Sequence, residues 1–258
     1  MTMLSGATRS VITERYALLA PDGFVPSNVP GWQNTVCQIV IAPQMGARFT
    51  QMLCTLDPTS TGEGITDDDE WFVFVETGSI SLHYRTVADL GEPHHVTLTA
   101  GGYAYLPPGT FYHVSDAHAA TRLLTLERYY TPHESEDIKL PDVVLGNEAD
   151  VPATPFMGDD GAMLKLLLPD TPAFDMAVNI FTFQPGTTLP MVETHVMEHG
   201  LLMIQGGGIY RLNNDWHPVQ HGDVIWMAAY CPQWFVATGK TPARYIYYKD
   251  VNRHPMHF

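Results

Sequence analysis

The sequence predicts an all-β protein of two tandem jelly-roll β-barrels, and three observations support this prediction. No amphipathic segment longer than ~10 residues has helical periodicity, which argues against bundles and α/β folds. The 21 Gly and 20 Pro lie in short, spaced patches, as in turn-rich β proteins. The strand-like segments of the first half recur in the same order in the second half. We expect a first domain over residues 1–150, which includes an N-terminal extension and a linker, and a second over residues 151–258.

Strand-like apolar runs in the first half alternate with turn signals. They lie at residues 35–43, 47–57, 71–85, 94–114 and 123–130. Thr77 and Gly78 separate two apolar runs, which is the signature of a β-hairpin. Residues 1–16 are polar and predict a peripheral segment. Residues 58–70 predict a polar loop. We interpret its acidic end, Asp67 to Glu70, as a solvated face rather than a cation site, because consecutive side chains of an extended chain point to opposite faces.

The second half repeats this order after a linker. Residues 131–160 are rich in proline and acidic residues and predict a linker with short elements. The repeated segments are residues 175–189, 199–212, 221–237 and 243–250, with Gly206 at the place of Gly78.

Charge and cysteine usage exclude several functional classes. A net charge of −15 argues against nucleic acid and anionic membranes as partners. The three cysteines are too scattered for a disulfide framework, and their odd number fits a reducing compartment. No run approaches the ~20 apolar residues of a membrane span, and the N-terminal residues do not resemble a signal peptide. We therefore expect a soluble, cytoplasmic protein.

One short stretch between Gly186 and Gly206 carries three candidate metal ligands. Glu193, His195 and His199 lie within seven residues. Side chains at i and i+2 of a strand share a face, so Glu193 and His195 can point into one barrel, and His199 can join them across a short turn. A carboxylate and two imidazoles this close indicate a metal site.

The spacing resembles that of the cupin motifs. The first usually reads G-x5-H-x-H-x3-4-E-x6-G; here six residues follow Gly186, Glu193 takes the first His place, His195 the second and His199 the Glu place. In the second motif, which starts at Gly222, the His place falls on Gln233. The implied ligand set is Glu193, His195, His199 and Gln233. Because these ligands are hard to borderline donors without a thiolate, they favour Mn(II), Fe(II) or Ni(II) over a structural zinc site.

The same motif spacing, applied to the first half of the chain, does not fall on a set of metal-ligand residues. It falls on Ile65, Asp67, Trp71 and Tyr112, which cannot chelate a transition metal. His113 is one residue past the ligand place and should face the other way. We expect the first barrel to be metal-free, with a role in packing or oligomer assembly.

Three further residues are candidates to bind a substrate. Tyr210, Tyr245 and Lys249 lie on predicted strands of the second barrel, and Tyr245 and Lys249 share a face because they are four residues apart. A lysine inside a small barrel calls for an anion such as a substrate carboxylate; the alternative is that Lys249 snorkels at the rim. Cys231 could face the site, but we interpret it as a small buried residue.

At this point the sequence resembles the (S)-ureidoglycine aminohydrolase family of bicupin enzymes. The resemblance rests on ALLAPDGFVPSNVPGW (17–32), on E-T-H-x-x-x-H-G (193–200), on N-N-x-W (213–216) and on Y-x-Y-x-K-D-x-N-R (245–253). It implies Mn(II) bound by Glu193, His195, His199 and Gln233, a small anionic ureido substrate held by Tyr210, Tyr245 and Lys249, and a homo-oligomer. The implied reaction, in purine and allantoin catabolism, converts (S)-ureidoglycine to (S)-ureidoglycolate and ammonia.

A mechanism follows as a hypothesis. Glu193 is the candidate proton shuttle, Lys249 and the tyrosines hold the carboxylate or ureido group, and Glu193 and Gln233 also face the substrate. Two alternatives stay open. Two His and one carboxylate resemble the triad of non-haem Fe(II) dioxygenases. The chain could also be a non-catalytic ligand-binding bicupin.

Overall fold

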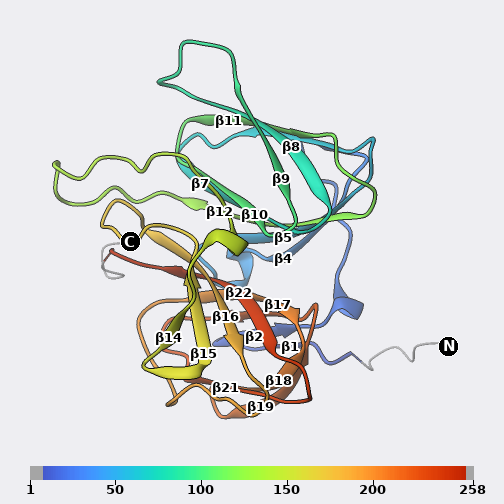
Figure 1. The fold of residues 1–258 in the computed structure, drawn as a ribbon, viewed down its shortest axis with the longest axis vertical. Helices are drawn as coiled ribbons and strands as arrows, with labels where there is room; N and C mark the ends of the chain where they lie inside the picture. The colour runs from blue at the N-terminus through green and yellow to red at the C-terminus, as the bar shows by residue number, and fades with distance from the viewer. Residues whose placement is uncertain (1–7, 254–258) are drawn as a thin grey trace.

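The computed structural model describes residues 8–253 (Figure 1). These residues form four antiparallel sheets joined by turns and loops. In the first barrel, the larger sheet has the strand order β13 (Val144–Asn147), β10 (Gly102–Leu106), β7 (Asp69–Thr77), β12 (Thr121–Tyr129), β5 (Thr50–Leu56) and β4 (Val36–Ile41). Its smaller sheet has the order β3 (Trp32–Gln33), β6 (Thr61–Ile65), β11 (Thr110–Ser115), β8 (Ser79–Thr86) and β9 (His94–Thr99).

The second barrel is built in the same way. Its larger sheet has the order β1 (Val11–Ile12), β2 (Tyr16–Leu19), β20 (Val224–Met227), β17 (His199–Gln205), β22 (Ala243–Asp250), β16 (Met176–Phe183), β15 (Asp159–Leu166) and β14 (Thr154–Phe156). Its smaller sheet contains β19 (Asp215–Gln220), β18 (Gly207–Leu212) and β21 (Gln233–Ala237). Short 3-10 turns cover Pro21–Gly23, Pro43–Met45 and Glu148–Asp150. The predicted all-β, two-barrel fold is confirmed.

The central strands are buried on both faces because the two barrels pack through their larger sheets. On β7, Trp71, Val73 and Val75 point into the first barrel, whereas Phe72 and Phe74 join an apolar cluster between the barrels. On β22, Tyr245 and Tyr247 point into the second barrel, and Ile246 and Tyr248 join the same intervening cluster. Such strands read as uninterrupted apolar runs rather than as alternating patterns.

The expected hairpin at Thr77 and Gly78 is wrong in its pairing. β7 and β8 are the predicted strands, but β7 pairs with β10 and β12 in one sheet, and β8 pairs with β9 and β11 in the other. Gly78 has a positive φ of 83°, and a Cβ there would overlap the side chain of Thr121. Gly206, with a φ of 65°, makes the equivalent crossing between β17 and β18. The tight turn therefore carries the chain from one sheet of the jelly roll to the other.

The acidic stretch before β7 is not a simple solvated loop. β6 lies within it, and Glu70 is fully buried, so the interpretation of Asp67 to Glu70 as a solvated face is wrong for Glu70. Alternation explains the difference: Glu70, like Phe72, is on the face of β7 that meets the second barrel.

The N-terminal strands belong to the second barrel's sheet. β2 pairs with β20, through Tyr16 opposite Met227 and Leu19 opposite Val224, and β1 pairs with β2. In Figure 1, both strands lie in the lower barrel. Residues 11–15 lie at the edge of this sheet and are mostly exposed, as expected of a peripheral segment, whereas Tyr16 is buried and contradicts that expectation. The expected assignment of all of residues 1–150 to one domain omits this exchange. A division near residue 150 stays a proposal. Within residues 8–253, no helix is long and apolar enough to span a bilayer.

A buried ion network ties the two barrels together. The Arg128 guanidinium donates to the backbone oxygen of Asp175 at 3.0 Å and to the Tyr248 hydroxyl at 2.9 Å. It also lies 3.3 Å from the Asp175 carboxylate and 3.7 Å from that of Glu70. Tyr105 donates to Glu70 at 2.6 Å. Burial, followed by the charge of Asp175, raises the pKa of Glu70 well above its usual range. Arg128 is therefore the cation that two buried carboxylates share.

We predict that Arg128→Ala destabilises the protein far more than a matched surface change on the same strand. Arg128 is 3% exposed, and its removal leaves buried carboxylates unpaired, which costs about 3–5 kcal/mol. Arg122 is 39% exposed beside Glu76, and Arg122→Ala should cost about 1 kcal/mol or less. Urea unfolding followed by tryptophan fluorescence measures both. Equal costs for the two variants would contradict the role given to Arg128.

Candidate metal centre

A loop and two strand starts bring the predicted ligands together at one end of the second barrel. The loop after β16 carries Glu193 and His195, His199 begins β17, and Gln233 begins β21. Glu193 and Gln233 exchange two backbone hydrogen bonds, at 2.8 and 2.9 Å, so they are directly opposite each other. Directly paired residues place their side chains on the same face, and here this face is the barrel interior.

The two imidazoles are oriented by backbone carbonyls and face each other. His195 Nδ1 lies 3.1 Å from the Met197 oxygen, and His199 Nδ1 lies 3.1 Å from the Tyr248 oxygen. Each Nδ1 must donate to a carbonyl, so each Nε2 presents a lone pair, and the two Nε2 atoms are 3.1 Å apart. Two lone pairs this close repel unless an electropositive centre lies between or beside them. Backbone-oriented histidines of this kind are typical of metal ligands.

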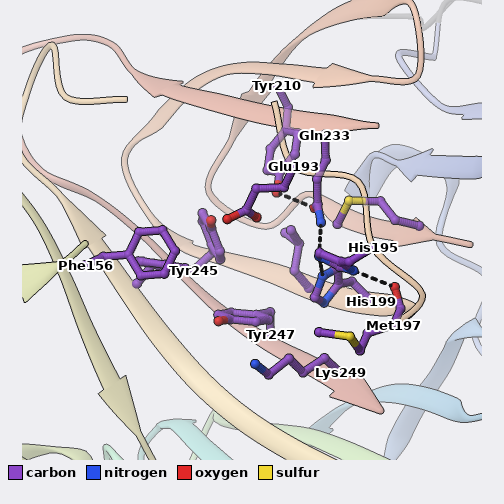
Figure 2. A pocket seen from close by; sticks show the side chains of 13 residues that line it. Phe156, Glu193, His195, Met197, His199, Tyr210, Gln233, Tyr245, Tyr247 and Lys249 are labelled. Atoms are coloured by element: carbon purple, nitrogen blue, oxygen red, sulfur yellow. Dashed lines mark hydrogen bonds between the residues drawn. The ribbon is translucent and has the colours of Figure 1, made fainter. Parts of the chain in front are cut away.

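Gln233 and Glu193 complete the donor set. The Gln233 side chain already lies beside His195, whereas the Glu193 side chain must rotate. Gln233 Nε2 is 2.9 Å from His195 Nε2, and rotation of the amide by half a turn presents its oxygen to the same point. Figure 2 shows the Glu193 carboxylate pointing away from the imidazoles. Consistent with this, no three His, Cys, Asp or Glu side chains of residues 8–253 already converge on one point. A side-chain rotation of Glu193 is needed, and the resulting set of two imidazoles, an amide oxygen and a carboxylate fits a divalent ion.

Burial keeps the site in the protonation state that metal binding needs. It lowers the pKa of His199 to about 3, with the nearby His195 as the second cause. Burial also lowers the pKa of His195. Both rings are therefore neutral near pH 7, with lone pairs available. Burial raises the pKa of Glu193, and the positive charge of Lys249 opposes that shift.

These groups open into a cavity of about 160 Å³, which suits a small molecule. Tyr210, Tyr245 and Tyr247 form its wall, and burial raises the pKa of each phenol, so all three stay protonated donors. Lys249 lies below Tyr247 in Figure 2 and forms no salt bridge to any residue in the described range 8–253. The cavity therefore holds neutral hydrogen-bond donors, one carboxylate and one lysine. Its lining residues are Phe156, Phe181, Glu193, His195, Met197, His199, Leu201, Tyr210, Met227, Gln233, Tyr245, Tyr247 and Lys249.

Every site residue expected from the sequence lines this cavity, and several lining residues were missed. Tyr247 contacts the ring of His199 at a centroid distance of 5.5 Å. The alternation that placed Tyr245 and Lys249 on one face of the strand also places Tyr247 there, so the sequence could have predicted Tyr247 as a lining residue. Phe156 comes from the linker, and no local pattern points to it. Cys231 is buried but does not line the cavity.

The first barrel supports this site from outside. Arg48, in the turn between β4 and β5, donates from its backbone nitrogen and from Nε to the Glu198 carboxylate, at 3.0 and 3.2 Å. It also donates to Asp250 at 2.8 Å, and Asp250 accepts from the Glu198 backbone nitrogen at 2.6 Å. Because Glu198 precedes His199 and Asp250 follows Lys249, this clamp positions both.

The corresponding place in the first barrel is filled by aromatic rings. Trp71 and Tyr112 stack inside the barrel with centroids 4.3 Å apart, while Ile65 is 55% exposed. His113 lies on the opposite face of β11 from Tyr112 and is partly exposed, as expected.

Comparisons with known proteins agree with this architecture. The sequence profile described as "Cupin domain" matches residues 179–248. The (S)-ureidoglycine aminohydrolase of Arabidopsis thaliana is 38% identical over 98% of this chain and 81% of its own length. The (S)-ureidoglycine aminohydrolase of Escherichia coli K12 is 36% identical over 96% of this chain and 93% of its own length. The crystal structure of protein Ylba from E. coli superposes with a TM-score of 0.82, at 32% identity over 96% of both chains.

We predict that Arg48→Ala weakens binding of Mn(II) by about 10–100-fold, because removal of a group that orients ligands typically has this effect. The matched control is Arg9→Ala, which removes a bidentate salt bridge to Asp223 elsewhere in the same barrel. Electron paramagnetic resonance of free Mn(II) measures the affinity. Equal affinity in the Arg48→Ala variant and the wild type would show that the clamp does not orient the site.

Proposed function

The chain belongs to the (S)-ureidoglycine aminohydrolase family, and from this premise we infer that it hydrolyses (S)-ureidoglycine to (S)-ureidoglycolate and ammonia, in purine catabolism. The observation that carries the inference is the cavity in which a pair of imidazoles, a carboxylate and a lysine face one small space. This arrangement suits a small anionic ureido substrate. It favours hydrolysis of a C–N bond over the dioxygenase and the non-catalytic ligand-binding alternatives.

We propose that Glu193, His195, His199 and Gln233 hold the metal ion. The donor set contains no thiolate, which favours Mn(II), Fe(II) or Ni(II) over a structural zinc site. Among these, the resemblance to the family favours Mn(II). A divalent ion bound there supplies a Lewis acid that orients and polarises the substrate. The two imidazoles are neutral and preoriented, so their contribution to binding requires no deprotonation at neutral pH.

Lys249 and the tyrosines would hold the substrate. The Lys249 ammonium is the only lysine or arginine side chain among the lining residues of this cavity, so it is the natural partner of the substrate carboxylate. Tyr210 and Tyr245 are buried, protonated phenols and can donate to the ureido or carboxylate oxygens. Tyr210 also lies 3.4 Å from Gln233, which links the substrate wall to the ligand set.

The reaction needs one proton movement that Glu193 is placed to perform. The C–N bond to the amino group breaks, the oxygen of water bonds to the same carbon, and the proton that water loses goes to the departing amine. A carboxylate that holds the ion through one oxygen can still offer its second oxygen to a proton. We propose that Glu193 carries that proton, and that Gln233 stays neutral beside it. A homo-oligomer in the cytoplasm is part of the same proposal.

We predict that His195→Ala abolishes metal-stimulated release of ammonia from freshly generated ureidoglycine. The spontaneous reaction provides the baseline, and Mn(II) should accelerate only protein with an intact imidazole pair. His221→Ala is the matched control, because His221 is an exposed histidine of the same barrel that pairs with Glu76. No acceleration by the wild-type protein would refute the proposed function, and full activity of His195→Ala would refute the ligand assignment.

We predict that Lys249→Met lowers kcat/KM about 10–100-fold, mainly through KM, because a hydrogen bond to a charged partner contributes about 1.5–3 kcal/mol. Lys240→Met, at an exposed lysine in the loop before β22, should leave both constants unchanged. Steady-state ammonia release measures both variants. An unchanged KM in Lys249→Met would mean that Lys249 does not hold the substrate.

A further inference from the structure

Three histidines and one glutamate form a row across the smaller sheet of the first barrel. His113 is directly opposite Glu63 on β6 and His83 on β8, and His83 is directly opposite His95 on β9. Directly paired residues share a face, so these four side chains lie side by side. Because their neighbours Leu82 and Val114 are fully buried, the row is on the outer face. In Figure 1, β8, β9 and β11 lie on the side of the first barrel away from the second barrel.

Two rings of the row lie close together. The His83 and His95 centroids are 4.6 Å apart, and those of His83 and His113 are 6.3 Å apart. For comparison, the centroids of His195 and His199, whose Nε2 atoms are 3.1 Å apart, are separated by 4.8 Å. The centroids of His83 and His95 are thus about as far apart as those of the candidate ligand pair in the second barrel, whereas their planes are inclined by 34° instead of 82°. A rotation of one ring would direct both sets of nitrogens to one ion.

We propose that His83 and His95 chelate a divalent transition-metal ion on this outer face, with His113 as a third imidazole after a change of rotamer. Among residues 8–253, no three His, Cys, Asp or Glu side chains already meet at one point. The proposed site therefore consists of the two imidazoles, and water would fill the other coordination positions. This site is separate from the barrel interior, where Trp71 and Tyr112 leave no ligands.

The surroundings of the row support a ligand role. One neighbouring row on the same face contains Ser115, Ser81 and Thr97, which are small polar residues, and the other contains Ile65, Phe111 and Arg85. The imidazoles are thus confined to a single line rather than spread over the face. His95 is exposed and His83 is half-exposed, so neither is needed to fill a core. An imidazole pair without a carboxylate favours Cu(II), Ni(II) or Zn(II) over Mn(II), which separates its preference from that of the inner site.

A bound ion would fasten the edge of the sheet. β9 is the edge strand, and it pairs within this sheet only with β8 through a hairpin whose loop covers residues 87–93. An ion held by His83 and His95 crosslinks the two strands near the end where this loop joins them. Because the unfolded chain does not hold the two rings together, binding favours the folded state.

Ni(II) is the probe that tests the proposal. We expect isothermal titration of the wild type to show an Ni(II) site that His199→Ala retains, because that variant affects only the second barrel. His83→Asn and His95→Asn should each weaken this site about tenfold or more, whereas His118→Asn, at an exposed histidine outside the row, should not. Ni(II) should also raise the thermal midpoint of His199→Ala, and this shift should be lost when His83→Asn is added.

The Ni(II) experiments test the outer-face site independently of the proposed enzymatic function. If addition of His83→Asn or His95→Asn to His199→Ala, with both proteins shown to be folded by circular dichroism, leaves the affinity for Ni(II) unchanged from that of His199→Ala alone, the proposal is overturned. It is also overturned if His199→Ala binds no Ni(II), because all binding then belongs to the inner site. Release of ammonia by His83→Asn should equal that of the wild type, whichever way the Ni(II) titration turns out.

Discussion

The clamp of Arg48 on Glu198 and Asp250 is the interaction on which the catalytic half depends. Both carboxylates are almost fully buried, and an unpaired buried carboxylate is costly, so the local structure is stable only with a cation between them. That cation comes from the first barrel. Glu198 adjoins His199 and Asp250 adjoins Lys249, so a single arginine orients a metal-ligand candidate and a substrate-binding candidate together. The first barrel thus supports the candidate site of the second barrel without contributing a ligand to it.

Close packing between the barrels reinforces this dependence. A Cβ at Gly200 would overlap the ring of Phe49, so the residue after His199 is a glycine because a side chain of the first barrel occupies that space. Phe49 also packs on Tyr248, whose carbonyl accepts from His199 Nδ1. The ring orientation of His199 is therefore linked to the interface through its neighbours on both β17 and β22. A rigid interface of this kind limits the movement of the imidazole that must stay near His195.

Period-two alternation and motif spacing predicted much of the fold and the whole list of expected site residues. They placed Tyr245 and Lys249 on one face and Gln233 at the ligand place of the second motif; the pairing of Gln233 with Glu193 came only from the structure. The local sequence pattern could not predict three features of the structure. Arg48 meets Asp250 from 202 residues away, and pairing over such a distance depends on tertiary packing. Gly78 looks the same in a hairpin and in a crossing between sheets. Glu70 looks solvated in an acidic run, because its partner Arg128 is visible only once β7 and β12 are adjacent.

The two barrels differ most in how completely one strand is paired, and this difference explains where a site can form. In the first barrel, β6 pairs residue by residue with β11 from Gly62 to Ile65, which commits the backbone to a ladder. In the second barrel, the equivalent segment keeps only two bridges, Thr188 to Val236 and Glu193 to Gln233. The rest of the segment is a loop, free to turn His195 inward toward His199. Backbone groups of this loop that are not paired in a sheet need other hydrogen-bond partners. Glu193 and Gln233 exchange two backbone hydrogen bonds, and the Tyr230 nitrogen donates to the His195 oxygen. Strict alternation alone would place Glu193 and His195 on one face, because they are two residues apart. The released backbone after Glu193 adds the turn that brings His199, at the start of β17, to the same cavity.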